Sequence, residues 1–207
     1  MRAATKTRLA VTASSVGAFV FFVGTSLHPP RDGEGISAVG ELYGLTHAIQ
    51  AIGLMLVALG LANLLASTRD QWSGLFGPVN TALAGTLAWL GLIVFDGAHN
   101  PALAQHAPEL VHRGASLDIG AALLVIPALI LFPLGHGVFA FALMRRRISP
   151  GLLLGLGALT YTVGGALILP LGPDSVLVQP LEVAGSLMFA IGYLLVSRVA
   201  VTPGRAI

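Results

Sequence analysis

Residues 119–144 read IGAALLVIPALILFPLGHGVFAFALM, a run that contains no charged side chain. An α-helix rises about 1.5 Å per residue, so roughly 20 residues cross the hydrocarbon core of a bilayer. The run is longer than this and predicts a membrane-spanning helix. Five further runs have a comparable length, and among them only the last contains a charged residue, Glu182.

The composition agrees with a chain built from such runs. Hydrophobic residues make up 55% of the sequence and charged residues 10%, with a mean hydropathy of +0.85. Soluble domains carry about 25% charged residues, which they need to cover their surface. We therefore expect an all-α, polytopic membrane helix bundle that forms a single transmembrane domain over residues 1–207. The six predicted transmembrane helices are residues 9–27, 48–66, 75–95, 119–144, 151–171 and 177–196.

The basic residues orient this bundle in the membrane. With six spans, nine of the eleven Lys and Arg residues fall on one side, and only Arg31 and Arg113 fall on the other. Cytoplasmic segments of membrane proteins are enriched in Lys and Arg. The sequence thus predicts a multi-pass protein of the cell membrane with both termini in the cytoplasm.

Several classes of function are excluded by what the sequence lacks. There is no cysteine, which removes disulfides, thiol catalysis and thiolate metal sites. No basic stripe with interleaved aromatic residues suggests a nucleic-acid partner. The expected environment is the lipid bilayer, with a lipophilic small molecule, a protein partner or a second copy of the chain as further candidates.

Acids and histidines gather on the predicted outer side. Eight of the nine acids and five of the six histidines lie there. Glu182 lies inside the sixth span, Asp118 precedes the fourth, His47 precedes the second and Asp96 follows the third. Such groups can move protons between a bound molecule and water.

His136 and Tyr161 form a second candidate site, near the middle of the membrane. His136 lies nine residues before Arg145, which places it about 13 Å into the bilayer. Tyr161 has a similar depth in the next span, so the two side chains can bond if their helices face each other. An ionisable residue at this depth suggests a function, because its solvation there is costly. The alternative is a neutral histidine that only joins two helices.

These residues lead to three hypotheses of function. The first is a membrane-embedded enzyme for a lipid or isoprenoid substrate, with acid–base chemistry at the outer face, for example a cyclisation or an isomerisation. Its predicted catalytic residues are the following: Glu182, Asp118, His47, Asp96, His136 and Tyr161. The sequence by itself does not decide whether the protein is an enzyme.

The second hypothesis is a proton-coupled transporter or an accessory subunit of a membrane complex. The sequence offers few polar residues for a continuous path across the membrane. Those that lie deep near the cytoplasmic end are Asn63, Asn80, Ser14 and Ser15. The third hypothesis is a haem- or metal-binding protein, with His28, His47 and His99 as candidate metal ligands. Their spacing matches no metal motif, and the sequence identifies no cofactor.

The predicted topology can be tested with reporters fused after Arg147 and after Asp174. These positions follow the fourth and fifth spans, so they should lie in the cytoplasm and outside it, respectively. An enzymatic reporter active on one side of the membrane only distinguishes the two. Cytoplasmic signals from both fusions would show that the span count is wrong.

Overall fold

The computed structural model describes residues 3–29, 31, 33–71, 73–107, 119–172 and 175–201. Within these residues all regular structure is helical. The long helices are α1 (Ala3–Ser26), α2 (Gly33–Gln71), α3 (Phe76–His106), α5 (Ile119–Arg145), α6 (Gly151–Ala166) and α8 (Val178–Val201). Two short helices complete the set, η1 (Ser73–Leu75) before α3 and α7 (Ile168–Leu171) after α6.

The described residues include six helical segments that are long and apolar enough to cross a membrane. They follow the same order along the chain as the six predicted spans, and each overlaps one of them. The prediction of an all-α bundle with six transmembrane helices is confirmed, and the architecture is that of an integral, multi-pass membrane protein.

Two of the helices extend well beyond the predicted spans. Helix α2 begins at Gly33 rather than near residue 48, and α3 continues to His106 rather than ending near residue 95. The extensions pack together through a small buried cluster of Ile36, Tyr43 and Ala104. Hydropathy alone missed them because polar and charged residues, among them Glu41 and Asp96, interrupt the apolar runs there. Their helical form depends on this mutual contact.

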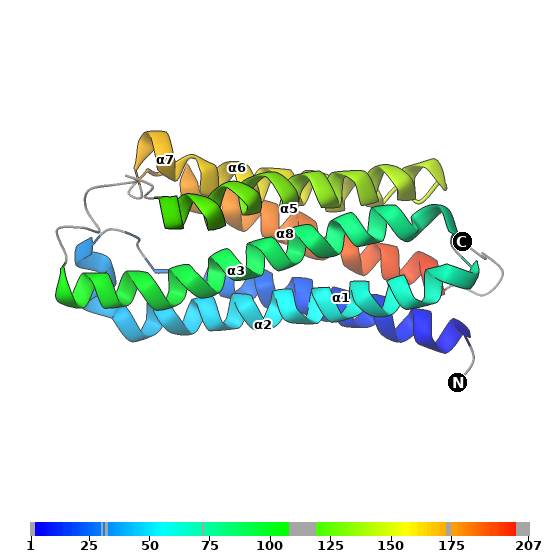
Figure 1. Ribbon diagram of the computed structural model, residues 1–207, viewed down its shortest axis with the longest axis horizontal. Coiled ribbons are helices and arrows are strands. Elements are labelled where there is room, and N and C mark those ends of the chain that lie inside the picture. The colour runs from blue at the N-terminus through cyan, green and yellow to red at the C-terminus, as the bar shows by residue number, and fades with distance from the viewer. Residues whose placement is uncertain are drawn as a thin grey trace.

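The six long helices form a closed ring. Each one packs against its neighbours in the order α1, α2, α3, α5, α6, α8, and α8 returns to pack against α1. Figure 1 shows the helices side by side along the long axis, with α1 beginning and α8 ending at the same end of the bundle. We call this the arginine end, because Arg8, Arg145 and Arg198 lie there. The opposite end is called the polar end.

Aromatic side chains fill the centre of the ring. Phe21 of α1, Trp89 of α3, Phe132 of α5, Tyr161 of α6 and Phe189 of α8 are all buried. Their rings contact one another with centroids 4.8 to 6.3 Å apart, mostly edge to face or tilted. These distances are those of directly packed rings. The interior at this level is therefore occupied by side chains from five of the six helices.

Glycines allow neighbouring helices to approach closely. Gly17 of α1 and Gly53 of α2 face each other, and a Cβ atom at Gly17 would lie 2.5 Å from the carbonyl oxygen of Gly53. A Cβ atom at Gly53 would lie 2.7 Å from the carbonyl oxygen of Gly17. In lipid, where helices are held by packing rather than by exclusion of water, such small residues favour association.

The Gly17–Gly53 contact predicts that a Gly to Ala substitution is more destabilising at Gly53 than at a glycine outside the helix contacts. Gly53→Ala should lower the free energy of unfolding by about 1–3 kcal/mol, because the added methyl group overlaps backbone atoms of α1. Gly91→Ala is the matched control, since its Cβ would meet nothing within 4 Å. Reversible unfolding in detergent measures both. Equal stability of the two variants would contradict the close contact.

Candidate functional site

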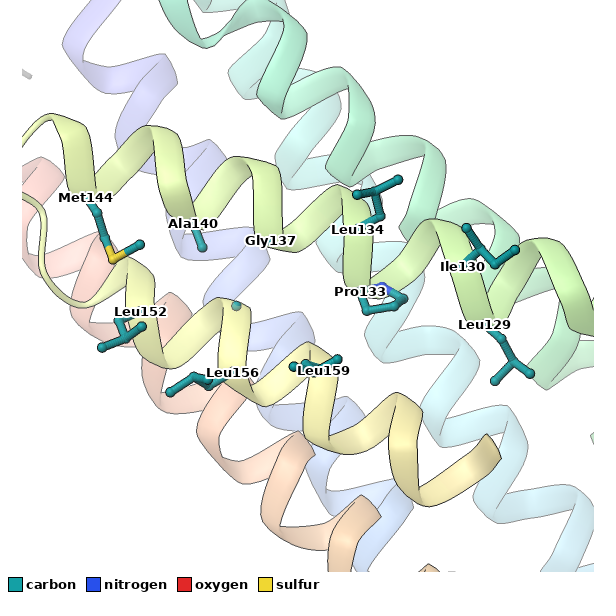
Figure 2. Close-up of a pocket in the computed structure, with 11 residues that line it drawn as sticks. Leu129, Ile130, Pro133, Leu134, Gly137, Ala140, Met144, Leu152, Leu156 and Leu159 are labelled. Carbon is teal, nitrogen blue, oxygen red and sulfur yellow. The ribbon is translucent and has the colours of Figure 1, made fainter. Parts of the chain in front are cut away.

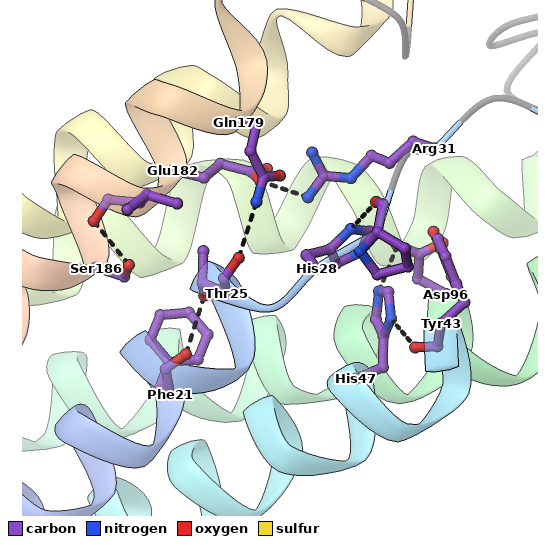
Figure 3. A network of polar contacts seen from close by, with 12 residues as sticks. Phe21, Thr25, His28, Arg31, Tyr43, His47, Asp96, Gln179, Glu182 and Ser186 are labelled. Atoms are coloured by element: carbon purple, nitrogen blue, oxygen red, sulfur yellow. Dashed lines mark hydrogen bonds and ion pairs between the residues drawn. The ribbon is translucent and has the colours of Figure 1, made fainter. Parts of the chain in front are cut away.

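The polar end gathers side chains from four parts of the chain. His28 and Arg31 lie between α1 and α2, His47 lies on α2, Asp96 on α3 and Glu182 on α8. Figure 3 shows these side chains turned toward one another between the helices. Except for Asp96, which is partly exposed, each is buried or nearly so. Helices distant in the sequence thus build one polar cluster.

His47 and Asp96 form a hydrogen-bonded pair. The His47 Nδ1 atom lies 2.9 Å from the carbonyl oxygen of Tyr43, and Nε2 lies 3.0 Å from Asp96 Oδ2. A carbonyl oxygen can only accept, so Nδ1 carries a hydrogen. One further proton must lie between Nε2 and Oδ2, on either the imidazole or the carboxyl group. The pair therefore holds one exchangeable proton in addition to the Nδ1 hydrogen.

Two neighbours orient the Asp96 carboxyl group. The Tyr43 hydroxyl donates to Asp96 Oδ1 at 3.1 Å, and the Asn100 amide also donates to Oδ1. The rings of Tyr43 and His47 stack with centroids 4.5 Å apart. His47 is 3% exposed, whereas the side chain of Asp96 is 28% exposed. Asp96 is thus the member of the pair through which water reaches the proton.

His28 contacts the pair from the α1 side. Its ring packs edge to face on Tyr43 and His47, with centroids 4.9 and 4.8 Å away. Nδ1 donates to the carbonyl oxygen of Pro29 at 2.7 Å, while the buried Nε2 has no partner among the described groups. Burial, and secondarily the nearby Arg31 guanidinium, lower the pKa of His28 to about 3. His28 is therefore neutral near pH 7.

Arg31 and Glu182 form a second pair, an ion pair that joins the segment after α1 to α8. The two side chains are only 12% and 4% exposed. Burial by itself would lower the pKa of Arg31, but the Glu182 carboxylate raises it, so the guanidinium stays charged. Gly164 of α6 makes room for the Glu182 side chain, since a Cβ atom there would lie 2.8 Å from its Cγ.

His136 lies apart from this cluster, inside the bundle. It is fully buried between Phe132, Phe189 and Tyr193, with ring centroids 4.6, 4.8 and 6.3 Å away. Its polar neighbours are the Phe132 carbonyl oxygen and Thr86 rather than Tyr161. Tyr161 and His136 both contact the Phe132 ring instead.

The predicted metal ligands are brought together only in part. His28 and His47 are in ring contact, but His99 is exposed and stacks on Phe95, with centroids 4.6 Å apart. Among the side chains that the structure describes, no group of three or more His, Asp or Glu is arranged to hold a metal ion. Asp118, predicted as a catalytic acid, lies outside the described residues.

A groove on the outside of the bundle is separate from the polar cluster. It lies between α5 and α6, has a volume of about 470 Å³ and is lined by aliphatic residues together with Met144, Pro133 and two glycines, Gly137 and Gly155 (Figure 2). None of the predicted catalytic residues lines it. Pro133 and Gly137 thus open a recess on the lipid-facing side, while His136 between them faces inward.

Several members of the polar cluster were not predicted from the sequence. The sequence could have marked Arg31 as a member of the cluster, because it is one of only two basic residues on the predicted outer side. Tyr43 precedes His47 by four residues, and Asn100 follows Asp96 by four, which is the spacing of neighbours on one helix face.

The comparisons with protein-family models, with curated proteins and with solved structures find no match to this chain.

The Arg31–Glu182 pair predicts a large loss of stability when one partner is removed. Glu182→Gln leaves a buried guanidinium without a counter-ion and should lower the free energy of unfolding by about 3–5 kcal/mol. Glu41→Gln, which neutralises an exposed acid of α2, should change it by less than about 0.5 kcal/mol. The double variant Arg31→Gln, Glu182→Gln should recover part of the loss. A Glu182→Gln protein as stable as Glu41→Gln would contradict the pairing.

Proposed function

We propose that this protein is a proton-coupled membrane protein, a transporter or the proton-handling subunit of a transport complex. In this proposal the His47–Asp96 pair takes up and releases the coupled proton at the polar end. The observation that carries it is the geometry of the pair. Both ring nitrogens of His47 are engaged, one by a backbone carbonyl and the other by Asp96.

This geometry favours proton exchange over catalysis by His47. A histidine that acts as a general base must offer one ring nitrogen to the substrate, within hydrogen-bond distance. His47 has no nitrogen left to offer, whereas the partly exposed Asp96 can exchange its proton with water. A buried histidine–carboxylate pair near a membrane surface is also a setting in which transporters hold protons.

The lipid-active enzyme predicted from the sequence is supported less well. Such an enzyme needs a space in which a lipophilic molecule reaches a proton donor. The groove between α5 and α6 is apolar, and neither Asp96 nor Glu182 lines it. Aromatic rings in direct contact fill the centre of the bundle. The enzyme, like the haem or metal protein, remains a prediction.

The charges of the cluster are compatible with proton coupling. Arg31 and Glu182 neutralise each other, and the His47–Asp96 pair with its shared proton adds no net charge, whichever atom holds that proton. Removal of the proton leaves one net negative charge in a largely buried site. Because this charge is costly to bury, it favours a rearrangement of the deprotonated site or the binding of a cation.

Proton flux into vesicles tests the proposal. The purified protein is placed in liposomes that contain a pH-sensitive dye, a pH gradient is imposed, and valinomycin with K⁺ clamps the membrane potential. Wild-type vesicles should acidify faster than protein-free vesicles, and Asp96→Asn should return the rate to the protein-free level. Glu41→Gln is the control, because this acid is exposed on α2. Equal rates in wild-type and protein-free vesicles would overturn the proposal.

A further inference from the structure

The groove between α5 and α6 has walls of large aliphatic side chains and a floor of small residues. On the walls, Leu134 of α5 and Leu156 of α6 are 58% and 43% exposed. The floor contains Gly137, Ala140 and Gly155. The two helices touch there, since a Cβ atom at Gly155 would lie 2.8 Å from the Cβ of Ala140. The groove is thus a narrow channel that opens to the outside of the ring (Figure 2).

This channel runs lengthwise from the arginine end past the middle of the bundle. On α5 its lining residues extend from Met144 back to Leu129, which is about 22 Å of helix. Half of the hydrocarbon core of a bilayer is roughly 15 Å thick. None of the lining residues is charged. The channel can therefore accompany one lipid chain through the whole leaflet at the arginine end.

Consecutive arginines lie where the channel reaches the arginine end. Met144 lines the channel, and the turn from α5 to α6 begins directly after it with Arg145, Arg146 and Arg147, all of which are exposed. The Arg146 guanidinium extends toward η1, since a Cβ atom at Gly74 would lie 3.2 Å from its Nη2. Arg145 and Arg147 are therefore the two charges that we assign to the end of the channel.

The backbone at Arg147 has a conformation that glycine normally adopts. Helix α5 ends in a Schellman motif, in which the Ile148 N–H donates to the Leu143 carbonyl oxygen at 3.1 Å and the Arg147 N–H to that of Met144 at 2.8 Å. Arg147 has a φ of 62°, a left-handed conformation that disfavours a long side chain. The arginine thus costs backbone stability and places a positive charge in the turn, which a bound anion would account for.

From these features we infer that the channel binds one acyl chain of an anionic phospholipid, with the lipid phosphate at Arg145 and Arg147. The inference is independent of the proposed proton coupling. An uncharged channel suits the chain, and guanidinium groups form strong, often bidentate hydrogen bonds with phosphate. The arginine end is the predicted cytoplasmic side, where basic residues next to membrane-spanning helices attract anionic lipids.

A transmembrane helix, from a second copy or from another protein, fits the channel less well. A helix with its side chains is about 10 Å across. Helices in membranes approach closely where small residues lie at the surface of their interface. Here Ile130 and Leu134, 54% and 58% exposed, stand above the small residues of the floor. A chain of methylene groups is thin enough to lie between such walls.

Gly137 allows the place of the acyl chain to be tested without a clash in the fold. It lines the channel, and a Cβ atom there would meet nothing within 4 Å. Gly137→Leu should weaken binding of the first lipid about tenfold, because the added side chain takes the place of methylene groups and their contacts. Gly91→Leu is the matched control and should bind like the wild type. Gly91 is exposed on α3, and its Cβ would also meet nothing within 4 Å.

Native mass spectrometry measures this binding. The purified protein is titrated in detergent with dioleoyl phosphatidylglycerol or with dioleoyl phosphatidylcholine, and the dissociation constant of the first bound lipid is compared. The wild type should bind the anionic lipid about tenfold more tightly. Arg145→Gln combined with Arg147→Gln should remove this preference, since each basic residue near the surface contributes about a factor of five. Arg198→Gln, at an exposed position of the same end on α8, should keep it.

Arg147→Gly separates lipid binding from folding. Glycine adopts the left-handed conformation without strain, so this variant should unfold in detergent at a temperature no lower than the wild type. Its preference for phosphatidylglycerol should nevertheless fall about fivefold. A less stable Arg147→Gly protein with an unchanged preference would show that Arg147 serves the fold and would overturn its assignment to the phosphate.

Three further outcomes would overturn the inference as a whole. The first is equal binding of the two lipids by the wild type, or a preference that survives the loss of both arginines. The second is unchanged lipid binding in Gly137→Leu. The third is a dimer without lipid preference that dissociates in Gly137→Leu, which would assign the channel to a second copy of the chain.

Discussion

The closure of the helix ring depends on the contact between the first and the last helix. Helices α1 and α8 are distant in the sequence, and their seam is joined by polar groups as well as by packing. Gln179 donates to the Thr25 carbonyl oxygen at 3.0 Å, and the Arg31–Glu182 ion pair lies beyond them at the polar end. Polar groups within a bilayer cannot form hydrogen bonds with water, so in the closed ring these groups bond to one another, whereas in an open ring they would lack partners.

The same seam places the polar cluster. Arg31 must lie over α8 to reach Glu182, and this position brings the preceding His28 against Tyr43 and His47. The positive charge of Arg31, added to burial, keeps His28 neutral. Closure of the bundle and the electrostatics of the His47–Asp96 pair are therefore consequences of one arrangement. A change at the contact between α1 and α8 should therefore also affect the His47–Asp96 pair.

Much of the fold could be predicted from the sequence because membrane insertion acts on short segments. Length and hydropathy predicted six spans, and the described residues contain six helices that are long and apolar enough to cross a membrane. The polar extensions of α2 and α3 could not be found this way, since their stability comes from the contact of Tyr43 and Ile36 with Ala104. Hydropathy records the affinity of a segment for lipid and does not record which segments pack together.

The individual residues of the candidate site could be predicted from the sequence, but the contacts between them could not. His47, Asp96, Glu182 and His136 stand out because charged or titratable groups are costly in a membrane. The sequence paired His136 with Tyr161 by depth, whereas helix rotation turns His136 toward Thr86 and leaves Phe132 between the two.

The sequence by itself determined that this chain crosses a membrane six times and that its titratable groups concentrate near one end. Both properties follow from the local balance of apolar and polar residues, which is set before any helix meets another. The tertiary structure alone decided that His47 bonds to Asp96, that Arg31 neutralises Glu182 and that Thr86 faces His136. These pairs depend on the order of helices in the ring and on their rotation, which close packing at glycines such as Gly17 and Gly53 determines.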